Sequence, residues 1–420
     1  MTPIAQNVPV EVIHQIFAPF ATTLRTDNLT AFPWFLGHIC STWRSVFRSM
    51  TAEFWYTISI SFEKDDKDGE DQDCYFSRPI KCSRHIKCVV QFFLERDPAA
   101  PLSFALVASE RLSQQDQDRV HPIMKMLIDE SMRWKDVSFQ CSYLNLTQFV
   151  RTKYHLPLLQ KLHLTIKAAN NLNAKLSPVF ETAPSLNVIE FGTFGDWKFV
   201  WSNLKDITLG YTDSAFYNAL PHMTNLERLH VRYEGIYFNG STTIVSLPRL
   251  TSLRCDPNLL RVIKAPQLED FTIGSNYLFQ PSIVLSFLRK SSCNILCLNI
   301  RRAEAATVIM IIQGTPQITR LMLADIPHVE RVLEMLIISC QESLARHILS
   351  LHIQDSYVKD AFETEVNMLS RLIVSRARVA GGYRYERLQR LCTFGLPDAA
   401  ATKLTALCKE CKVEYENEWK

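Results

Sequence analysis

The chain has 420 residues, of which 47% are hydrophobic and 21% are charged, so it is long enough for a large core and has the composition of a globular protein. Its formal net charge is only +3, which argues against nucleic acid or an anionic membrane as the main partner. Its 12 glycines are few for this length, which disfavours glycine-rich phosphate-binding loops and all-β folds that are dense in hairpins.

Two apolar helical segments are predicted near the N-terminus. In the first, Val10–Phe20, apolar side chains recur at helical spacing on one face, and Pro9 suits a first helical turn because its missing N–H costs nothing there. Residues 21–33 are expected to form a connector. The second helical region presents a broad apolar surface from Trp34 to Phe47. A helix pair this short has too little interior to be stable alone, so we expect it to pack against another surface.

A strand and an acidic segment are expected next. Residues Trp55–Phe62 alternate between apolar and small polar side chains, a pattern typical of a β-strand. In Lys64–Asp73, six acidic residues outweigh two lysines, which indicates a solvated loop over about residues 63–75. The spacing of these acids does not fit the calcium loop of an EF-hand.

The rest of the chain repeats a block of the form apolar–x–x–apolar–x–apolar. One such block means little, because amphipathic helices produce it freely, but eight in series are much harder to obtain by chance. The clearest are "PLLQKLHL" (Pro157–Leu164), "PSLNVIEF" (Pro184–Phe191), "SNLKDITL" (Ser202–Leu209), "TNLERLHV" (Thr224–Val231), "PRLTSLRC" (Pro248–Cys255), "PQLEDFTI" (Pro266–Ile273), "CNILCLNI" (Cys293–Ile300) and "PQITRLML" (Pro316–Leu323). Looser blocks are Trp55–Ile60, Trp134–Phe139, His347–Ile353 and Arg387–Phe394.

The spacing of the blocks predicts the fold class. Their first apolar residues, at positions 159, 186, 204, 226, 250, 268, 295 and 318, follow one another at 18 to 27 residues, close to the range of about 20–29 for leucine-rich repeats. Helical patterns separate several blocks, at Ile283–Ser291, Ala305–Gly314 and Val329–Cys340. We therefore predict an α/β fold with a helical module at residues 1–55. An irregular leucine-rich-repeat solenoid would follow at 56–420, with a parallel sheet on the concave face, helices outside and a C-terminal capping helix.

The N-terminal segments resemble a known module, the F-box. "VPVEVIHQIF" (Val8–Phe17) is similar to its first half, and "LGHICSTWRSVFRSMTAEFW" (Leu36–Trp55) is similar to its second half. Val8 stands where the F-box usually has leucine, and the connector after Phe20 is longer than in a compact F-box. With its repeats, nearly the whole chain resembles the F-box proteins with degenerate leucine-rich repeats that are abundant in mushroom-forming fungi. The matching positions are Pro9, Glu11, Ile16, Phe17, Leu36, Ile39, Cys40, Trp43, Arg44, Phe54 and Trp55.

The resemblance implies a non-catalytic substrate-recognition subunit of a Skp–cullin–F-box ubiquitin ligase. The F-box would bind a Skp-type adaptor, and through it a cullin, while the repeats would bind a protein substrate that the sequence does not name; no enzyme activity and no cofactor are expected. The alternative is that the helix pair simply caps the N-terminal end of the solenoid. The whole chain would then be a leucine-rich-repeat scaffold or ligand-binding protein with a decayed F-box and no ubiquitin-ligase role. The adaptor-binding candidates are Val8, Pro9, Val12, Ile13, Ile16, Phe17, Leu36, Ile39, Cys40 and Trp43.

Polar residues within the repeat strands are candidates for substrate binding. Side chains that alternate with the buried apolar ones face the concave surface, and arginines cluster there on neighbouring repeats, which favours an acidic or phosphorylated ligand. The alternative is a solvated face whose arginines pair with Asp256 and Asp270. The candidates are Arg228, His230, Arg232, Arg254, Asp256 and Arg301.

Signals for catalysis and for metals are weak. The sequence has no P-loop, no G-x-S-x-G and no H-E-x-x-H motif. Cys74, Cys82, His85 and Cys88 lack the second close cysteine pair of a zinc site, and Cys88 is expected on a helix face. Cys408–Cys411 is a lone C-x-x-C that, with Leu404 and Leu407, reads as the buried face of the final helix.

The cysteines and the hydrophobic runs bear on the compartment. Many of the 12 cysteines lie at apolar positions, which indicates buried thiols in a reducing environment. Glu11 and His14 interrupt the N-terminal apolar run, so no signal peptide is expected. Phe271–Leu288 is uncharged but contains Gly274 and Pro281, which favours a loop between a strand and a helix over a membrane span. We therefore expect a cytoplasmic or nuclear protein, with no membrane or nucleic-acid partner.

Overall fold

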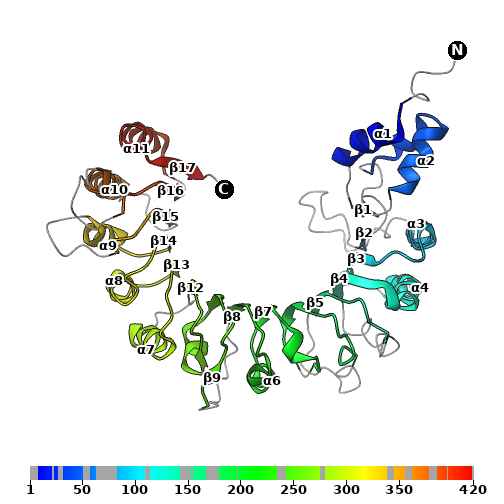
Figure 1. Ribbon diagram of the computed structural model, residues 1–420, viewed down its shortest axis with the longest axis horizontal. Helices are drawn as coiled ribbons and strands as arrows, with labels where there is room; N and C mark the ends of the chain where they lie inside the picture. Colours follow the sequence, from blue (N-terminus) through cyan, green and yellow to red (C-terminus); the bar gives the residue numbers. More distant parts are fainter. Residues whose placement is uncertain are drawn as a thin grey trace, which may run out of the picture. The chain divides into compact units, whose positions relative to one another are not determined.

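The structure is a computed structural model of the chain (Figure 1). It describes residues 8–20, 23–26, 32–50, 57–62, 83–108, 114–141, 152, 155–166, 179–195, 197–233, 243–274, 280–337, 345–354, 362–377, 386–394 and 396–418. The chain divides into two compact units, Met1–Leu204 and Lys205–Lys420, and each unit is described by itself below.

The first unit joins short helices to a parallel sheet. Its strands lie in the order β1-β2-β3-β4-β5-β6, and each pairs in parallel with the next. The strands are β1 (Leu24–Arg25), β2 (Thr57–Ser61), β3 (Leu102–Val107), β4 (Trp134–Cys141), β5 (Lys161–Ile166) and β6 (Val188–Thr193). The helices are α1 (Val10–Phe17), α2 (Ser41–Ser49), α3 (Ser83–Arg96) and α4 (Gln114–Asp129), with 3₁₀ helices η2 (Ala18–Phe20), η4 (Trp34–His38), η6 (Ser131–Arg133) and η8 (Trp201–Asn203).

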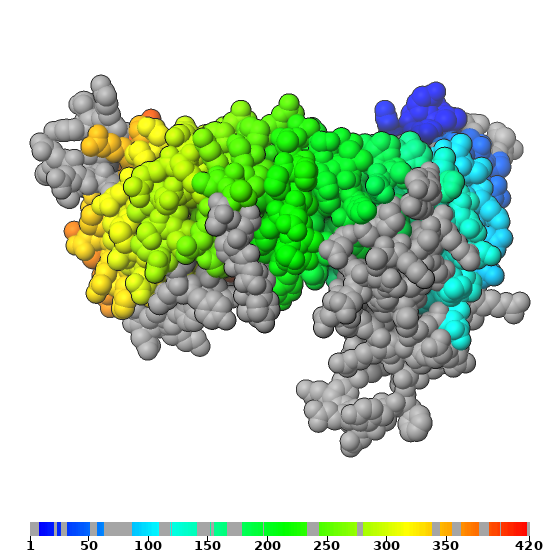
Figure 2. Space-filling model, turned by 90° about the horizontal axis from the view of Figure 1, so that it is seen from below, coloured from blue at the N-terminus to red at the C-terminus, as the bar shows by residue number. Residues whose placement is uncertain are grey.

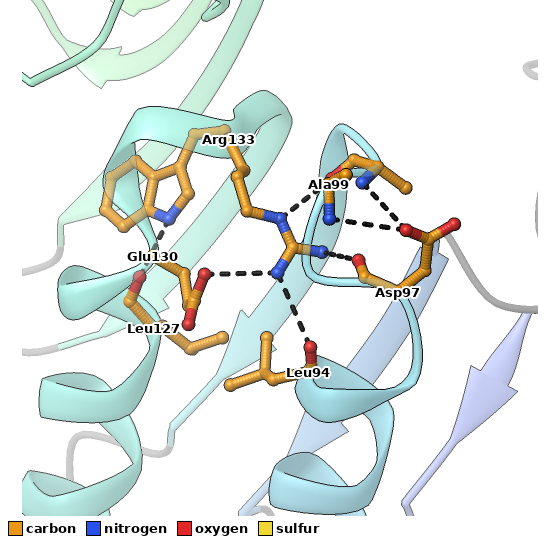
Figure 3. Close-up of polar contacts among 8 residues, drawn as sticks. Leu94, Asp97, Ala99, Leu127, Glu130 and Arg133 are labelled. Atoms are coloured by element: carbon orange, nitrogen blue, oxygen red, sulfur yellow. Dashed lines mark hydrogen bonds and ion pairs between the residues drawn. The ribbon is translucent and has the colours of Figure 1, made fainter.

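Arg133 ties the end of α3 to the start of β4 (Figure 3). Its Nε donates to the carbonyl oxygen of Ala100 at 2.8 Å, Nη2 donates to that of Asp97 at 2.6 Å, and Nη1 donates to that of Leu94 at 3.4 Å. Nη1 also pairs with Glu130 at 3.1 Å. Leu94 lies in the last turn of α3, where carbonyls have no intrahelical partner, and the same guanidinium also binds two carbonyls of the segment that follows the helix.

The second unit continues with alternating strands and helices. Its main sheet has the order β7-β8-β10-β12-β13-β14-β15-β16-β17, and β9 pairs with β11 in a separate parallel pair. The strands are β7 (Asp206–Tyr211), β8 (Arg228–Tyr233), β9 (Val245–Ser246), β10 (Ser252–Cys255), β11 (Ile263–Lys264), β12 (Asp270–Gly274), β13 (Cys297–Arg301), β14 (Arg320–Ala324), β15 (Ser350–Gln354), β16 (Arg390–Phe394) and β17 (Glu414–Glu418). The helices are α6 (Ser214–Ala219), α7 (Pro281–Ser291), α8 (Ala305–Gln313), α9 (Val329–Leu336), α10 (Phe362–Ala377) and α11 (Asp398–Glu410), with 3₁₀ helices η9 (Leu220–His222) and η10 (Pro257–Arg261).

Neighbouring strands of the main sheet of this unit pair in parallel, which requires the chain to cross back between them. A helix or a short 3₁₀ helix lies on each of these connections except that from β8 to β10, whose described residues contain β9. In Figure 1 the helices α7 to α11 lie on one side of these strands. In Figure 2 the surface of this unit changes from green through yellow to orange in bands, so each segment lies beside the one next in sequence.

The same hydrogen bonds recur at each block. The N–H of Leu250 donates to the carbonyl of Leu247 at 3.3 Å and closes a turn, and the N–H of Thr251 then donates to the carbonyl of Glu227 in the preceding block at 2.9 Å. A repeated sequence pattern thus produces a repeated turn. The equivalent bonds between blocks run from the N–H of Glu227 to Lys205, Glu269 to Thr251, Leu296 to Glu269, Thr319 to Leu296, Leu349 to Thr319, Gln389 to Leu349 and Glu414 to Gln389.

In the core of the second unit, buried apolar residues of one strand lie directly beside those of the next. Leu298 on β13 lies beside Leu321 on β14, and two residues later Ile300 lies beside Leu323; all four side chains are buried. A single strand and helix would leave such a face open to water, and the next strand and helix cover it.

Most predicted elements are confirmed. The eight clear blocks each lead into an observed strand, from β5 to β14, and the three helical patterns correspond to α7, α8 and α9. The expected α/β class with parallel strands is also confirmed. Within the uncharged run Phe271–Leu288, strand β12 ends at Gly274 and helix α7 begins at Pro281, so a strand and a helix are present as predicted. Residues 275–279 lie outside the described residues. The acidic segment at 63–75 lies outside the described residues.

Three predicted boundaries differ. The first helix ends as an α-helix at Phe17 and continues as the 3₁₀ turn η2. The second helical region is two elements, because Cys40 has an extended backbone between η4 and α2. The predicted capping helix, α11, is followed by the strand β17, which pairs with β16, so the described chain ends on a strand.

Candidate functional site

Helix α1 presents two different faces. Ile13 and Phe17, one turn apart, are both 0% exposed, whereas Val12 and Ile16, also one turn apart, are 42% and 39% exposed. Residues four apart in a helix lie on the same face, so the helix buries one apolar stripe and leaves a second in water.

The inner stripe packs against α2. The ring of Phe17 lies edge to face with that of Trp43, with centroids 5.1 Å apart, and at 6.2 Å from that of Phe47. Arg44 Nε donates to the carbonyl of Gly37 at 2.8 Å and fixes η4 against α2. These contacts make the helix pair a small packed body of its own.

The outer stripe extends beyond α1. Phe20 follows Ile16 by four residues, and its ring lies edge to face with that of Phe35 on η4, with centroids 5.7 Å apart. Both rings are exposed, as is Ile39 at the junction of η4 and α2. We call Pro9, Val12, Ile16, Phe20 and Phe35 the outer apolar surface. Fully burying side chains of this kind stabilises a complex by about 1.5–3 kcal/mol each, so this surface could contribute several kcal/mol to binding.

The structure divides the ten adaptor-binding candidates. Pro9, Val12, Ile16 and Ile39 are exposed, and Val8, Cys40 and Trp43 are partly exposed. Ile13, Phe17 and Leu36 are buried within the helix pair, so a partner could touch them only after rearrangement. They support the surface rather than form it.

The outer apolar surface includes residues that the sequence did not single out. Phe20 and Phe35 are exposed members of this surface, and neither was among the adaptor-binding candidates. The apolar character of Phe35 is visible in the sequence. Its contact with Phe20 is not, because the two residues are 15 positions apart and meet only in the folded chain.

The basic candidates lie on neighbouring strands of the second unit. His230 on β8 pairs in register with Arg254 on β10, and Arg254 pairs with Thr272 on β12. Thr272 pairs with Asn299 on β13. Arg232 and Arg301 follow His230 and Asn299 by two residues and therefore lie one row further along the same face of the sheet. We call His230, Arg232, Arg254, Asn299 and Arg301 the basic strand face.

His230 lies within the electrostatic influence of three arginines of this face. The pKa of His230 is lowered from 6.5 to about 4, first by burial and then by the guanidinium groups of Arg254, Arg232 and Arg301, whereas the carboxylate of Asp206 acts in the opposite direction. His230 is therefore neutral at pH 7.

Two of the predicted residues have local partners. Arg228 Nε donates to Asp206 Oδ2 at 2.8 Å, so its charge is matched by a neighbouring carboxylate. Asp256 Oδ1 accepts from the N–H of Asn258 at 3.3 Å and caps the 3₁₀ helix η10. Arg228 is therefore paired within the sheet, but with Asp206 and not with Asp256 or Asp270, the partners that the alternative named.

The cysteine predictions are partly tested. Cys408 and Leu404 on α11 are buried as predicted, and burial raises the pKa of the Cys408 thiol to about 11, which disfavours a reactive thiolate. Cys88 lies on α3 and is exposed. Cys74 and Cys82 of the considered zinc set lie outside the described residues. Within the described ranges, no three His, Cys, Asp or Glu side chains are grouped so that they could hold a metal ion.

Among the helices that the structure describes, none has both the length and the apolar character needed to cross a membrane. No model of a known protein family matches the chain, and no curated protein matches it.

Proposed function

We propose that this protein is the substrate-recognition subunit of a Skp–cullin–F-box type ubiquitin ligase. In this proposal the N-terminal helix pair is an F-box that binds a Skp-type adaptor, and the strands and helices after it are a leucine-rich-repeat solenoid that binds a protein substrate. The protein itself performs no chemistry, and its role is to bring two partners together.

The outer apolar surface is the observation that carries the proposal. Ile13 and Phe17 already hold α1 to α2, so Val12, Ile16 and Phe20 are not needed for that packing, yet they remain exposed. Contiguous exposed apolar side chains on a soluble surface favour a protein partner. An amphipathic helix whose second face is apolar suits insertion into a groove of that partner.

The repeat architecture supports the second half of the proposal. The strands of the second unit expose polar and charged side chains in rows, with successive rows about 6.6 Å apart along a strand. Stacked repeats of this kind offer an extended surface that can bind a protein segment.

A pulldown tests whether the helix pair binds a Skp-type adaptor. The full chain is co-expressed with a tagged Skp-type adaptor, as wild type and as the double variant Pro9→Ala/Ile16→Asp. The wild-type chain should be retained with the tagged adaptor. The variant should not be retained, because a carboxylate at position 16 would have to be desolvated in the complex.

The matched control is Met310→Asp. Met310 on α8 is 38% exposed, nearly the same as Ile16, but it lies far along the sequence from the helix pair. This variant should bind the adaptor like the wild type. If the folded wild-type chain does not bind the adaptor, the proposal is wrong, and a repeat scaffold without a ubiquitin-ligase role becomes the better description.

A further inference from the structure

The basic strand face contains buried polar atoms that lack hydrogen-bond partners. Among the residues that the structure describes, His230 Nε2, Arg301 Nε and Asn299 Oδ1 are buried and unpaired. These atoms belong to side chains on β8 and β13, in the two adjacent rows that also hold Arg232 and Arg254. A buried polar atom without a hydrogen-bond partner destabilises the protein, so a ligand that supplies the missing partners is favoured.

Gly274 on β12 accommodates the close approach of Arg301 on β13. Gly274 on β12 pairs in register with Arg301, and a Cβ added at Gly274 would lie 3.0 Å from the Cβ of Arg301. Neighbouring strands are about 4.8 Å apart, so Arg254 and Arg301 are about two strand spacings apart and can converge on one small ligand.

Two carboxylates near this face have partners of their own. Asp206 is paired with Arg228, and Asp256 caps η10. The three guanidinium groups that act on His230 outnumber the one carboxylate that acts on it. Guanidinium groups bind phosphate oxygens in a bidentate manner, and a neutral imidazole can add a hydrogen bond without adding charge.

The size of the cluster favours a single anionic group over a polyanion. Asp206 borders it on β7, and Asp270 lies beside it on β12. At the other end of the sheet, β17 carries Glu414, Glu416 and Glu418. An extended nucleic-acid backbone crossing these strands would meet these carboxylates, whereas one phosphorylated side chain would not.

We infer that the basic strand face binds a phosphorylated serine or threonine side chain of a protein segment, with Arg232, Arg254 and Arg301 as the phosphate ligands and His230 as an uncharged hydrogen-bonding group. This inference rests on the proposed function, in which these strands bind the substrate, and it adds that phosphorylation of the substrate controls binding. The side-chain amide of Asn299 then hydrogen-bonds the peptide backbone beside the phosphate.

The test uses the full-length chain and a fluorescent peptide library with one central phosphoserine or phosphothreonine. Binding is measured by fluorescence anisotropy for the library, its unphosphorylated counterpart, inorganic phosphate and a single-stranded 12-nucleotide DNA. The phosphorylated library should bind, and removing the phosphate should weaken binding at least tenfold. Equal binding of the unphosphorylated library, or tighter binding of the DNA, would overturn the inference, as would no binding of any peptide.

Variants assign the binding to this face. Arg254→Gln and Arg301→Gln should each weaken binding of the phosphorylated library at least tenfold. Arg390→Gln is the matched control, because Arg390 is an exposed arginine on β16 whose Nη2 already pairs with Glu416 at 2.6 Å. It should leave binding unchanged. Undiminished binding by Arg254→Gln and Arg301→Gln would overturn the inference.

A second readout needs no variant of the arginines. The pKa of His230, followed by NMR of histidines labelled with ¹³C at Cε1, should rise when the phosphorylated peptide binds, because a dianion offsets the three guanidinium groups. An unchanged pKa in the presence of a bound phosphopeptide would place the peptide elsewhere and overturn the inference.

Different outcomes would contradict the proposed function and the present inference. Arg254→Gln and Arg301→Gln should retain the Skp-type adaptor, and Pro9→Ala/Ile16→Asp should retain the phosphopeptide. A wild-type chain that binds the phosphopeptide but not the adaptor would contradict only the proposed function, and a wild-type chain that binds the adaptor but not the phosphopeptide would contradict only this inference.

Discussion

The ring of Phe17 meets the ring of Trp43 edge to face at 5.1 Å, while Ile16, the residue before it in the same helix, points away from α2. Adjacent positions of one short helix therefore have different roles. Phe17 holds the helix pair together, and Ile16 belongs to the surface that we propose for the adaptor. This division can be measured, because the two roles respond to different experiments.

Phe17→Ala should destabilise the helix pair, whereas Ile16→Ala should not. Removing a fully buried phenylalanine side chain costs about 3–5 kcal/mol, and a surface substitution usually changes the free energy of unfolding by no more than about 0.5 kcal/mol. Urea unfolding followed by tryptophan fluorescence, which includes the signal of Trp43, measures both. Equal stabilities of the two variants would contradict the assignment of Phe17 to the interior.

Arg133→Met should destabilise the first unit by about 2 kcal/mol, because it removes the hydrogen bonds to the carbonyls of Leu94, Asp97 and Ala100 while keeping much of the side-chain volume. Amide hydrogen exchange should also become faster around residues 97–100. The control is Arg331→Met, at an exposed position of α9, which should leave stability nearly unchanged. Unaltered exchange around residues 97–100 in Arg133→Met would contradict the role given to Arg133.

His230 should make the protein less stable as the pH falls from about 6.5 to about 4. In the unfolded chain this imidazole takes up a proton near pH 6.5, whereas in the folded chain it does so only near pH 4, so between these values the unfolded state binds more protons. The groups that act on it are Arg232 on its own strand, Arg254 on β10, Arg301 on β13 and Asp206 on β7. The stability that His230 contributes is therefore present above pH 6.5 and is lost as the pH falls.

Two measurements check the behaviour of His230. An NMR titration should place its midpoint near pH 4, and His230→Gln should reduce the difference in unfolding free energy between pH 7 and pH 4.5. A midpoint near 6.5 would show that burial and the guanidinium groups do not act on this imidazole as the structure indicates.

Gly274→Ala should destabilise the protein more than Gly314→Ala. The added Cβ at position 274 would lie 3.0 Å from the Cβ of Arg301, which is held by the strand, and such crowding costs about 1–3 kcal/mol. At position 314 the nearest atom is Cδ2 of Leu285, at 2.8 Å, which is the end of a flexible side chain and can move. Chemical unfolding of the two variants measures the difference, and a larger loss for Gly314→Ala would contradict this comparison.

The strands were the most predictable part of the fold. In a block such as "PQITRLML", the apolar residues Leu321 and Leu323 alternate with polar ones, and this local pattern was enough to place β14 at Arg320–Ala324. The helices after β12, β13 and β14 were predicted for the same reason, since their apolar periodicity is local. The break at Cys40 was not predicted, because a 3₁₀ helix followed by an α-helix exposes nearly the same apolar pattern as one continuous helix.

The candidate surfaces were only half predictable. The sequence correctly placed His230 and Arg254 on neighbouring strands, but it could not distinguish Arg228, which is paired with Asp206, from Arg301, whose Nε is unpaired. It likewise grouped Asp256 with the arginines, although this carboxylate caps η10. Such choices depend on side-chain conformations and on the register between strands that are more than 20 residues apart in sequence.

By itself, therefore, the sequence determined the order and type of the elements, because these follow from apolar periodicity within a few residues. Only the tertiary structure decided which apolar side chains of α1 are already buried and which charged side chains of the strands already have partners. Ile13 and Ile16 are chemically the same, and they differ in exposure only because α2 lies on one side of the helix. A residue's availability to a partner is a property of what surrounds it, and the surroundings are set by contacts between distant parts of the chain.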